Sequence, residues 1–428
     1  MGGVDTAPPK DANERMCALH GGTRMTQARQ TGSADLSRLP LLARLAFRYA
    51  ENLRIGRLDV TLPDGRMLTF GGREPGPHAE MTVHDLGFAR RMMSGGEIGL
   101  AESFMRGEWE SPNLTAFLEL FCVNHAAIAT MLDGRGLIRW WQRIRHVMNR
   151  NTKGGSRRNI HAHYDLGNRF YSAWLDRTMT YSSAIFAPGD NDLVSAQTRK
   201  YRALANAIDA KPDHRLLEIG CGWGGFAEYA AKEIGCRVTG LTISKEQFEF
   251  AQKRIHDAGL AERVTFKLQD YRDETGVYDR IASIEMFEAV GESYWPTFFR
   301  QMSERLAPGG VAGVQVITIQ ERFFENYRRE IDFIRRYIFP GGMLPTPTIM
   351  RDLGEKFGVP LKHEIEFALD YARTLAAWRE RFFAAWPHLP PLGFDERFKR
   401  MWSYYLSYCE AGFRSRNIDV RQMVFAKG

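Results

Sequence analysis

The residues best suited to chemistry form a glycine-rich segment behind an apolar run. Residues 215–219 include Glu218 in an otherwise largely apolar stretch, and the next six residues read Gly-Cys-Gly-Trp-Gly-Gly. Glycine lets the backbone approach a ligand closely, and the unpaired N–H groups at the start of the next helix face that ligand. We therefore expect a strand, turn and helix that hold a cofactor at Glu218, Gly220, Cys221, Gly222 and Gly224.

The second predicted strand, residues 237–241, distinguishes between two kinds of cofactor. A dinucleotide-binding site would need an acidic residue near the end of this strand to hold the ribose hydroxyls. Thr242 stands there instead, and Ser244 follows it. S-adenosylmethionine (SAM) is a sulfonium cation, which the carboxylate of Glu218 and nearby aromatic rings favour. The pattern therefore predicts SAM and methyl transfer.

Polar residues after the third and fourth predicted strands are further candidates. Asp270, Tyr271 and Arg272 follow residues 264–268 at the sheet edge where ligands bind, although an acidic residue after a strand is also a common helix cap. Glu288 follows residues 280–284 within an apolar stretch, where a solvated surface charge is a poor explanation. We therefore expect Glu288 to be functional.

Cysteine and histidine residues carry weaker signals. Cys409 lies on a long aromatic helix, where a buried thiol is more often inert packing than a nucleophile. His161 and His163 suggest metal binding, but no third ligand follows at a suitable spacing, so no metal site is expected.

The alternation of strands and helices predicts how these residues are positioned. From residue 215 onward it indicates an α/β fold with a parallel sheet and right-handed crossovers. Seven strands, the last antiparallel, match a Rossmann-like class I SAM-dependent methyltransferase, predicted over 161–428. Residues 39–132 predict a small α+β domain with a helix at 38–53, a hairpin of 58–62 and 67–70, and helical periodicity from 83 to 131. Residues 1–38 predict a disordered tail.

Charge and composition indicate the setting in which the protein works. The net charge is +7, and residues 134–164 contain no acidic residue. The predicted basic linker helix, 133–160, places Trp140 and Trp141 opposite arginines, which suits either a membrane interface or packing onto the next domain. The sequence shows no signal-peptide pattern, no run long enough to span a membrane, and five cysteines without paired spacing. We expect a cytoplasmic protein at the inner face of the membrane.

Several motifs in order resemble the cyclopropane-fatty-acyl-phospholipid synthases. The resemblance covers about residue 45 to the end, including the small N-terminal domain. It rests on residues 160–171 (IHAHYDLGNRFY), 179–183 (MTYSS), 216–225, 241–247 (LTISKEQ), 268–273 (LQDYRD), 286–288 (MFE), 337–342 (YIFPGG) and 405–414.

The resemblance implies roles for individual residues. The SAM site would include Tyr181, Ser182, Gly220, Gly222, Thr242, Gln247, Tyr271 and Arg272, beside the residues named above (Glu218, Cys221, Gly224, Ser244, Asp270). A bicarbonate ion would serve as base, held by Glu288, Tyr371, Ser183, Gln315 and Ile317. His163, Tyr164 and Cys409 would belong to the catalytic site. The implied partners are unsaturated phospholipids, which the N-terminal domain would present, and a second copy of the chain in a homodimer.

In the implied reaction, a cis alkene of an acyl chain takes up the SAM methyl group and becomes a carbocation, which needs a dry pocket lined by ring faces. Candidate rings are Phe287, Tyr294, Trp295, Phe298, Tyr337, Phe339, Tyr371 and Trp378. Loss of a proton from the new methyl group closes a cyclopropane, whereas loss from the chain leaves a methyl-branched or methylene product.

Three departures from the family pattern surround the expected bicarbonate site. Ser183 replaces a cysteine, Ala289 a histidine and Gln315 a second histidine. They motivate the hypothesis of a divergent member with a methyl-branched or methylene product. Two rival classes remain, namely a methyltransferase for a small-molecule acceptor and a basic RNA-binding protein with a vestigial SAM fold. The chain shows no RNA-binding module, so no nucleic acid partner is expected.

Overall fold

The computed structural model describes residues 35–125, 166–190 and 192–428. The predicted tail up to residue 34, the predicted linker helix at 133–160, His163 and Tyr164 lie outside these ranges. Among the helices that are described, none combines the length and the apolar character that crossing a membrane requires.

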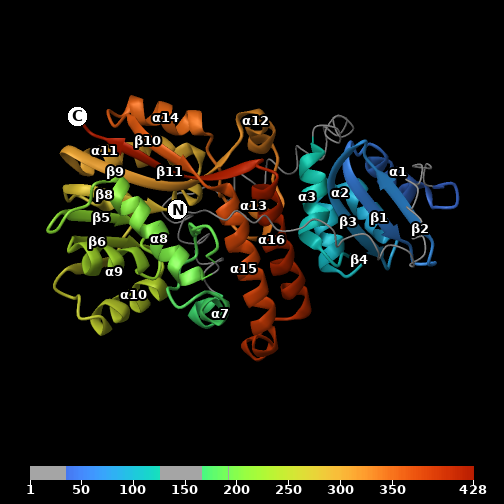
Figure 1. The fold of residues 1–428 in the computed structure, drawn as a ribbon, viewed down its shortest axis with the longest axis horizontal. Coiled ribbons are helices and arrows are strands. Elements are labelled where there is room, and N and C mark those ends of the chain that lie inside the picture. Colours follow the sequence, from blue (N-terminus) through green and yellow to red (C-terminus); the bar gives the residue numbers. More distant parts are fainter. Residues whose placement is uncertain (1–34, 126–165, 191) are drawn as a thin grey trace, which may run out of the picture. The chain divides into compact units, whose positions relative to one another are not determined.

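The N-terminal part of the chain forms a four-stranded sheet with the order β2-β1-β3-β4, drawn in blue to cyan in Figure 1. The predicted hairpin is confirmed, since β1 and β2 pair antiparallel. The pattern does not predict β3, because Pro75 and Pro77 cannot donate backbone hydrogen bonds, yet β3 pairs in parallel with β1. The elements are α1 (Leu41–Glu51), β1 (Ile55–Thr61), β2 (Met67–Gly71), β3 (Glu74–Val83), α2 (Gly87–Met105), β4 (Trp109–Glu110) and α3 (Leu114–Val123).

The second sheet has seven strands in the order β10-β11-β9-β8-β5-β6-β7. Strands β5 to β9 pair in parallel, whereas β11 is antiparallel to both of its neighbours. This topology confirms the predicted class I methyltransferase sheet. Its strands are β5 (Arg215–Ile219), β6 (Arg237–Thr242), β7 (Val264–Leu268), β8 (Tyr278–Ile284), β9 (Leu306–Ile319), β10 (Leu361–Glu366) and β11 (Ile418–Ala426).

Helices cover both faces of this sheet because successive strand residues point to opposite sides. Leu216 packs in a core with α8, α9 and α10, and Leu217 packs in a separate core with α11 and α14. Figure 1 shows these two helical layers on either side of the strands. The helices are α7 (Gly167–Trp174), α8 (Leu193–Ala207), α9 (Gly225–Tyr229), α10 (Lys245–Asp257), α11 (Trp295–Arg305), α12 (Glu321–Arg329), α13 (Phe333–Tyr337) and α14 (Pro347–Lys356). The π-helix η1 comprises Ala230–Ile234. The short 3-10 helices are η2 (Tyr271–Asp273), η3 (Phe287–Ala289), η4 (Glu292–Tyr294), η5 (Trp386–His388) and η6 (Pro390–Leu392).

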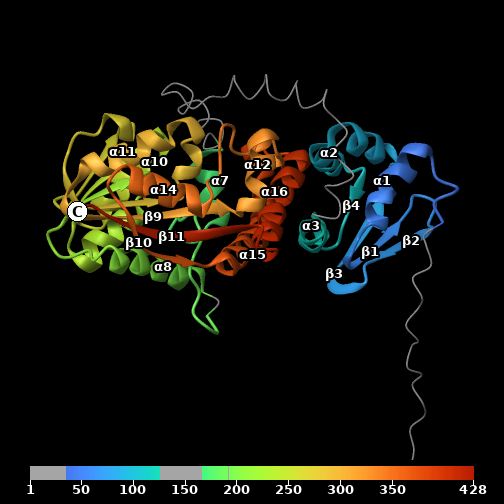
Figure 2. The same ribbon diagram turned by 90° about the horizontal axis from the view of Figure 1, so that it is seen from above.

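Two long helices, α15 (Ala368–Ala385) and α16 (Glu396–Arg414), separate β10 from β11 in the sequence and pack against each other. Helix α16 also packs against α3, and Figure 2 shows α16 beside α15 from above. The carboxylate of Glu410 on α16 is buried and accepts a hydrogen bond from Thr115 of α3 at 3.1 Å. The N-terminal sheet and the large sheet are thereby joined through α16.

Candidate functional site

A cavity of about 800 Å³ lies at the carboxyl ends of β5, β6, β7 and β8 and continues toward helices α1, α2, α3 and α16. Most of the residues predicted from the sequence lie on its wall. They are Tyr181, Ser182, Glu218, Gly220, Cys221, Gly222, Thr242, Gln247, Asp270, Tyr271, Arg272, Glu288, Ile317, Tyr371 and Cys409. Four of the predicted cofactor and bicarbonate residues do not line the cavity: Ser183, Gly224, Ser244 and Gln315.

Ser244 and Gly224 support the wall from behind. The hydroxyl of Ser244 accepts a hydrogen bond from the backbone N–H of Gln247 and caps α10. A Cβ atom on Gly224 would lie 3.0 Å from Phe266 and 3.2 Å from Ala251, so this glycine permits close packing of the turn onto α10 and β7. The structure therefore gives both residues a packing or capping role, where the sequence pattern predicts direct contact with a cofactor.

The glycine turn has the backbone conformation that close ligand approach requires. Gly220 and Gly222 have φ angles of 83° and 52°, a region that other residues rarely adopt. A Cβ atom on Gly220 would lie 2.6 Å from the Met286 side chain, whereas one on Gly222 would meet nothing within 4 Å. The backbone at Gly222 therefore faces open space in the cavity.

A buried carboxylate and a buried ammonium lie beside this turn. Burial raises the pKa of Glu218 to about 8, against the opposing effect of the Lys200 charge. Burial likewise lowers the pKa of Lys200 to about 8, and its Nζ donates to Ser182 Oγ at 2.6 Å. Within the described residues, Glu218 Oε2 has no hydrogen-bond partner although it is buried. An unsatisfied carboxylate oxygen on the wall fits a cationic ligand such as SAM.

Polar groups from β6 and β7 line the same end of the cavity. Thr242 Oγ1 donates to Gln247 Oε1 at 3.0 Å, which orients the amide. The two carboxylate oxygens of Asp270 accept hydrogen bonds from the Arg272 guanidinium at 2.8 and 2.7 Å. Both sequence interpretations of Asp270 are therefore compatible with its position, because it caps η2 and also lines the cavity. The Tyr271 hydroxyl is buried and has no partner among the described residues.

Glu285 is the residue that the sequence interpretation missed. It directly follows β8, with a φ of 49° that is strained for any residue with a side chain. Its Oε1 accepts hydrogen bonds from the Ser183 backbone N–H at 2.8 Å and from Gln315 Nε2 at 2.7 Å. Its Oε2 accepts one from the Tyr371 hydroxyl at 2.5 Å. The sequence holds one signal that could have identified Glu285: it is a second acidic residue in the same apolar stretch, three positions before Glu288.

Burial raises the pKa of Glu285, while its three hydrogen bonds and the Lys200 charge act in the opposite direction. Glu288 lies on the same turn, and its Oε1 accepts a hydrogen bond from the Ile317 backbone N–H at 2.6 Å. Burial, together with the negative charge of Glu285, raises the pKa of Glu288 to about 8. Glu288 Oε2 has no hydrogen-bond partner within the described residues.

The groups predicted to hold bicarbonate do not fit a separate ion. The Ser183 backbone N–H, Gln315 Nε2 and the Tyr371 hydroxyl all donate to the Glu285 carboxylate, and the Ile317 backbone N–H donates to Glu288. The Ser183 hydroxyl instead donates to the Ala184 carbonyl at 3.0 Å. In the described residues the other donors therefore bind carboxyl groups of the protein itself, where the resemblance predicts a bicarbonate ion.

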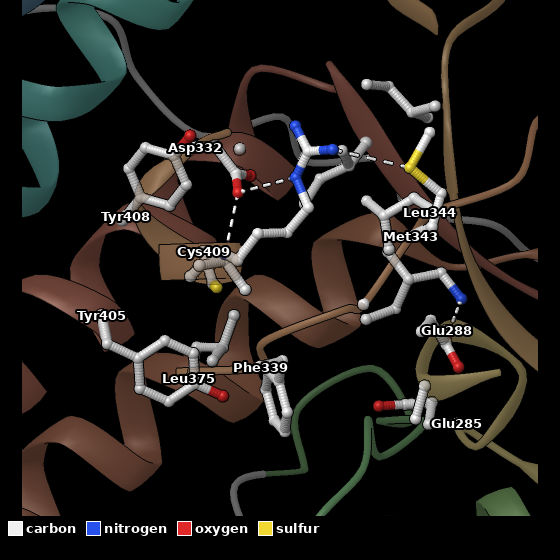
Figure 3. A pocket seen from close by; sticks show the side chains of 18 of the residues that line it. Glu285, Glu288, Asp332, Phe339, Met343, Leu344, Leu375, Tyr405, Tyr408 and Cys409 are labelled. Carbon is white, nitrogen blue, oxygen red and sulfur yellow. Dashed lines mark hydrogen bonds and ion pairs between the residues drawn. The ribbon is translucent and has the colours of Figure 1, made fainter. Parts of the chain in front are cut away.

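Cys409 lies on the cavity wall near Tyr405 and Tyr408, as Figure 3 shows. Burial raises the pKa of its thiol far above the ordinary value, so the thiol stays protonated at neutral pH. A thiolate nucleophile is thus not expected at this position.

The aromatic lining of the cavity differs from the predicted set. Phe339 and Tyr371 are on the wall, together with Tyr181, Tyr405 and Tyr408. Phe287, Trp295 and Phe298 instead pack with one another in the core beneath the sheet, and Trp378 is completely buried outside the cavity. Tyr294 and Tyr337 do not line the cavity either.

The far part of the cavity is apolar and is built by the N-terminal helices. Its wall includes Ala46, Phe47 and Ala50 of α1, Ile98 and Leu100 of α2, and Phe117, Leu118 and Phe121 of α3. The cavity therefore connects a polar end at the sheet with an apolar end at the small domain.

A parallel sheet of this order, with a binding cavity at the carboxyl ends of its first strands and a buried carboxylate ahead of a glycine turn, defines a class I SAM-dependent methyltransferase. Comparison with known proteins identifies the family within this class. Residues 151–423 match the model of the mycolic acid cyclopropane synthetase family, and the chain belongs to that family.

Curated relatives and solved structures agree with this assignment. Tuberculostearic acid methyltransferase UfaA1 of Mycobacterium tuberculosis is 40% identical over 346 residues, covering 78% of this chain and 80% of the relative. The cyclopropane-fatty-acyl-phospholipid synthase of Escherichia coli is 38% identical over 353 residues, covering 82% and 88%. The crystal structure of mycolic acid cyclopropane synthase CmaA1 complexed with SAH and CTAB matches with a TM-score of 0.60 and 30% identity, covering 63% of this chain and 98% of that one.

Proposed function

We propose that this enzyme transfers a methyl group from SAM to the cis double bond of an unsaturated fatty acyl chain of a membrane phospholipid and produces a cyclopropane fatty acyl chain. The observation that carries the proposal is the continuous cavity, which joins the polar end at Glu218 and Gly222 to the apolar end at Phe47 and Phe117. The polar end suits SAM and the apolar end suits a hydrocarbon chain. The relative from Escherichia coli, named for a phospholipid product, supports the substrate class.

The residues at the polar end fit SAM, which when bound would supply an electrophilic methyl group. Glu218 would offer its unsatisfied Oε2 to the cationic cofactor. The absence of a side chain at Gly222 would let the cofactor approach the backbone there. Thr242, Gln247 and Tyr271 would bind the remaining polar groups of the cofactor.

Aromatic side chains would stabilise the carbocation that methyl transfer leaves on the acyl chain and would shield it from water. The hydroxyls of Tyr181 and Tyr405 lie 2.7 Å apart and satisfy each other, and both residues line the cavity. The ring of Tyr371 stacks on Phe413 at 4.4 Å. Rings without free polar groups exclude water and stabilise positive charge through their faces.

The fate of this carbon determines the product. If a proton leaves the new methyl group, its bonding electrons close a cyclopropane ring. If a proton leaves the chain, a methyl-branched alkene forms, and a hydride shift before loss from the methyl group forms a methylene product. The relative named tuberculostearic acid methyltransferase, at 40% identity, supports a methyl-branched or methylene product as the alternative to a cyclopropane.

The setting of the reaction is also a proposal. We infer that the small N-terminal domain presents the acyl chain, because α1, α2 and α3 build the apolar end of the cavity.

We propose that the enzyme is a cytoplasmic homodimer that binds the inner face of the membrane through the basic segment around Trp140 and Trp141. Light scattering measures the oligomeric state. Sedimentation with anionic vesicles, compared between the wild type and a Trp140→Ala/Trp141→Ala variant, measures the membrane contact.

The decisive experiment supplies SAM with a trideuterated methyl group and vesicles of phospholipid with cis-monounsaturated chains. Mass spectrometry of the released acyl chains then identifies the product. A cyclopropane keeps two deuterons, and a methyl-branched alkene keeps three. A methylene product also keeps two, but it takes up hydrogen on mild catalytic hydrogenation. Vesicles with saturated chains serve as the control. Labelling of a small amine with no labelling of acyl chains would refute the proposal.

A further inference from the structure

We propose that the Glu285 carboxylate is the general base of the reaction and takes the place of a bound bicarbonate ion. This inference rests on the proposed function, because it names the group that accepts the proton in that reaction. Figure 3 shows Glu285 and Glu288 next to each other at one side of the pocket, near Phe339.

The first observation is the backbone strain at Glu285. A left-handed conformation is unfavourable for a residue with a Cβ atom, whereas glycine adopts it readily. Glu285 nevertheless adopts a φ of 49°, and its backbone N–H donates to the Gln315 carbonyl at 2.8 Å. Strained residues of this kind concentrate at functional sites, where surrounding contacts hold them. The turn therefore places a carboxylate at a position whose backbone conformation would favour glycine.

The second observation is the set of hydrogen bonds that hold this carboxylate. The Ser183 backbone N–H, Gln315 Nε2 and the Tyr371 hydroxyl come from three distant segments and converge on its two oxygens. Gln315 is itself oriented, because its Oε1 accepts a hydrogen bond from Gln422 Nε2 at 3.0 Å. Ser183 and Gln315 are completely buried. The three donors thus fix the orientation of the carboxylate on the cavity wall.

The third observation concerns the charges that face Glu285. Burial raises the pKa of Glu285, whereas the charge of the buried Lys200 and the three hydrogen bonds favour its ionised form. Glu288 on the same turn has a pKa raised to about 8, and only the Ile317 backbone N–H donates to its carboxyl group. Of the two carboxyl groups, Glu285 is thus the one whose ionised form the surrounding groups stabilise more, and it lies on the cavity wall, where it can accept a proton.

The proposed step balances within the acyl chain and Glu285. After methyl transfer, a C–H bond of the new methyl group breaks and its electron pair forms the second ring bond to the electron-poor carbon. The proton passes to the Glu285 carboxylate, which becomes a neutral carboxylic acid. Release of that proton to solvent after the product leaves restores the base, and no further reactant is consumed.

The first test measures methyl transfer from labelled SAM to vesicles in buffer depleted of carbon dioxide and bicarbonate. We expect the wild-type rate to be unchanged within twofold when bicarbonate is removed. A wild-type enzyme that loses most of its activity on depletion and regains it with added bicarbonate would overturn the proposal. A wild-type enzyme that labels no acyl chain under any condition would instead refute the proposed function, so the two failures are distinguishable.

The second test replaces Glu285 by glycine, which suits the left-handed backbone and removes the carboxylate. In depleted buffer we expect Glu285→Gly to lose about 10²–10⁴-fold in rate, the range for removal of a general base, with SAM affinity by calorimetry within threefold of wild type. Added formate or bicarbonate should restore the rate at least tenfold. A folded, SAM-binding Glu285→Gly protein that neither anion restores, or that retains its rate without them, would overturn the inference.

Two further variants separate loss of the base from loss of the side-chain shape and from a general structural effect. Glu285→Gln keeps the shape of the side chain but cannot accept a proton, so it should be as slow as Glu285→Gly without being restored by anions. Glu274→Gln is the matched control, because Glu274 also accepts hydrogen bonds from a tyrosine hydroxyl, Tyr278 at 3.0 Å, and from a backbone N–H, Gly276 at 2.8 Å, and does not line the cavity. We expect Glu274→Gln to keep the wild-type rate. An active Glu285→Gln protein would overturn the inference.

Discussion

Replacing Tyr371 by phenylalanine removes one hydroxyl group and leaves the ring that stacks on Phe413 at 4.4 Å. The hydroxyl donates to Glu285 Oε2 at 2.5 Å and lowers the pKa of that carboxyl group. A hydrogen bond to a charged group contributes about 1.5–3 kcal/mol, and about 1.4 kcal/mol corresponds to a tenfold change in a protonation equilibrium. Because the base must be ionised to act, the acidic limb of the pH–rate profile of Tyr371→Phe should move to higher pH by about one to two pH units.

The assay is the pH dependence of kcat/KM for labelled methyl transfer. Below the limb, Tyr371→Phe should be about ten- to a hundredfold slower than wild type, with similar rates at high pH. Tyr278→Phe is the control, since it deletes a comparable hydrogen bond to Glu274, away from the cavity, and should leave the profile unchanged. If the folded Tyr371→Phe protein shows the wild-type limb, the role of this hydrogen bond, and with it our reasoning about Glu285, is wrong.

Three further predictions follow from buried groups on the same wall. Cys409→Ser should keep activity within about threefold, and wild-type Cys409 should resist iodoacetamide at pH 8, because burial raises the pKa of its thiol. Rapid inactivation by alkylation of Cys409 would contradict this. Glu218→Gln should weaken SAM binding about ten- to a hundredfold by calorimetry, because a bound cation favours the ionised form of Glu218 and an amide cannot ionise; unchanged affinity would remove Glu218 from the cofactor site. The pKa of Glu288, raised to about 8, stabilises the folded state below the ordinary carboxyl pKa, and this contribution is lost as the pH rises through about 8. Without SAM, Tm should therefore fall less between about pH 5 and pH 9 in Glu288→Gln than in wild type; parallel Tm curves would contradict this.

The predictable part of the fold comes from local patterns. Strands buried on both faces read as short apolar runs, and glycines and caps mark their ends, which is why β5 to β9 and the hairpin of β1 and β2 match the prediction. Strand β3 contains Pro75 and Pro77, so only its pairing with β1 reveals it as a strand. The aromatic candidates could not be assigned from the sequence either, because the spacing of aromatic residues does not tell whether a ring faces a cavity or the core. In the structure Phe287 faces the core.

The sequence by itself determined the cofactor and the family. The glycine turn after Glu218, the absence of an acid at Thr242 and the ordered motifs all lie in short, contiguous segments whose chemistry follows from residue type and spacing. Tertiary structure decided which group can act as base. The resemblance grouped Ser183, Gln315 and Tyr371 around one bicarbonate ion, but only the folded structure shows that all three donate hydrogen bonds to Glu285, a residue outside the predicted set. Such a convergence depends on the directions of side chains from distant segments, which no local pattern encodes.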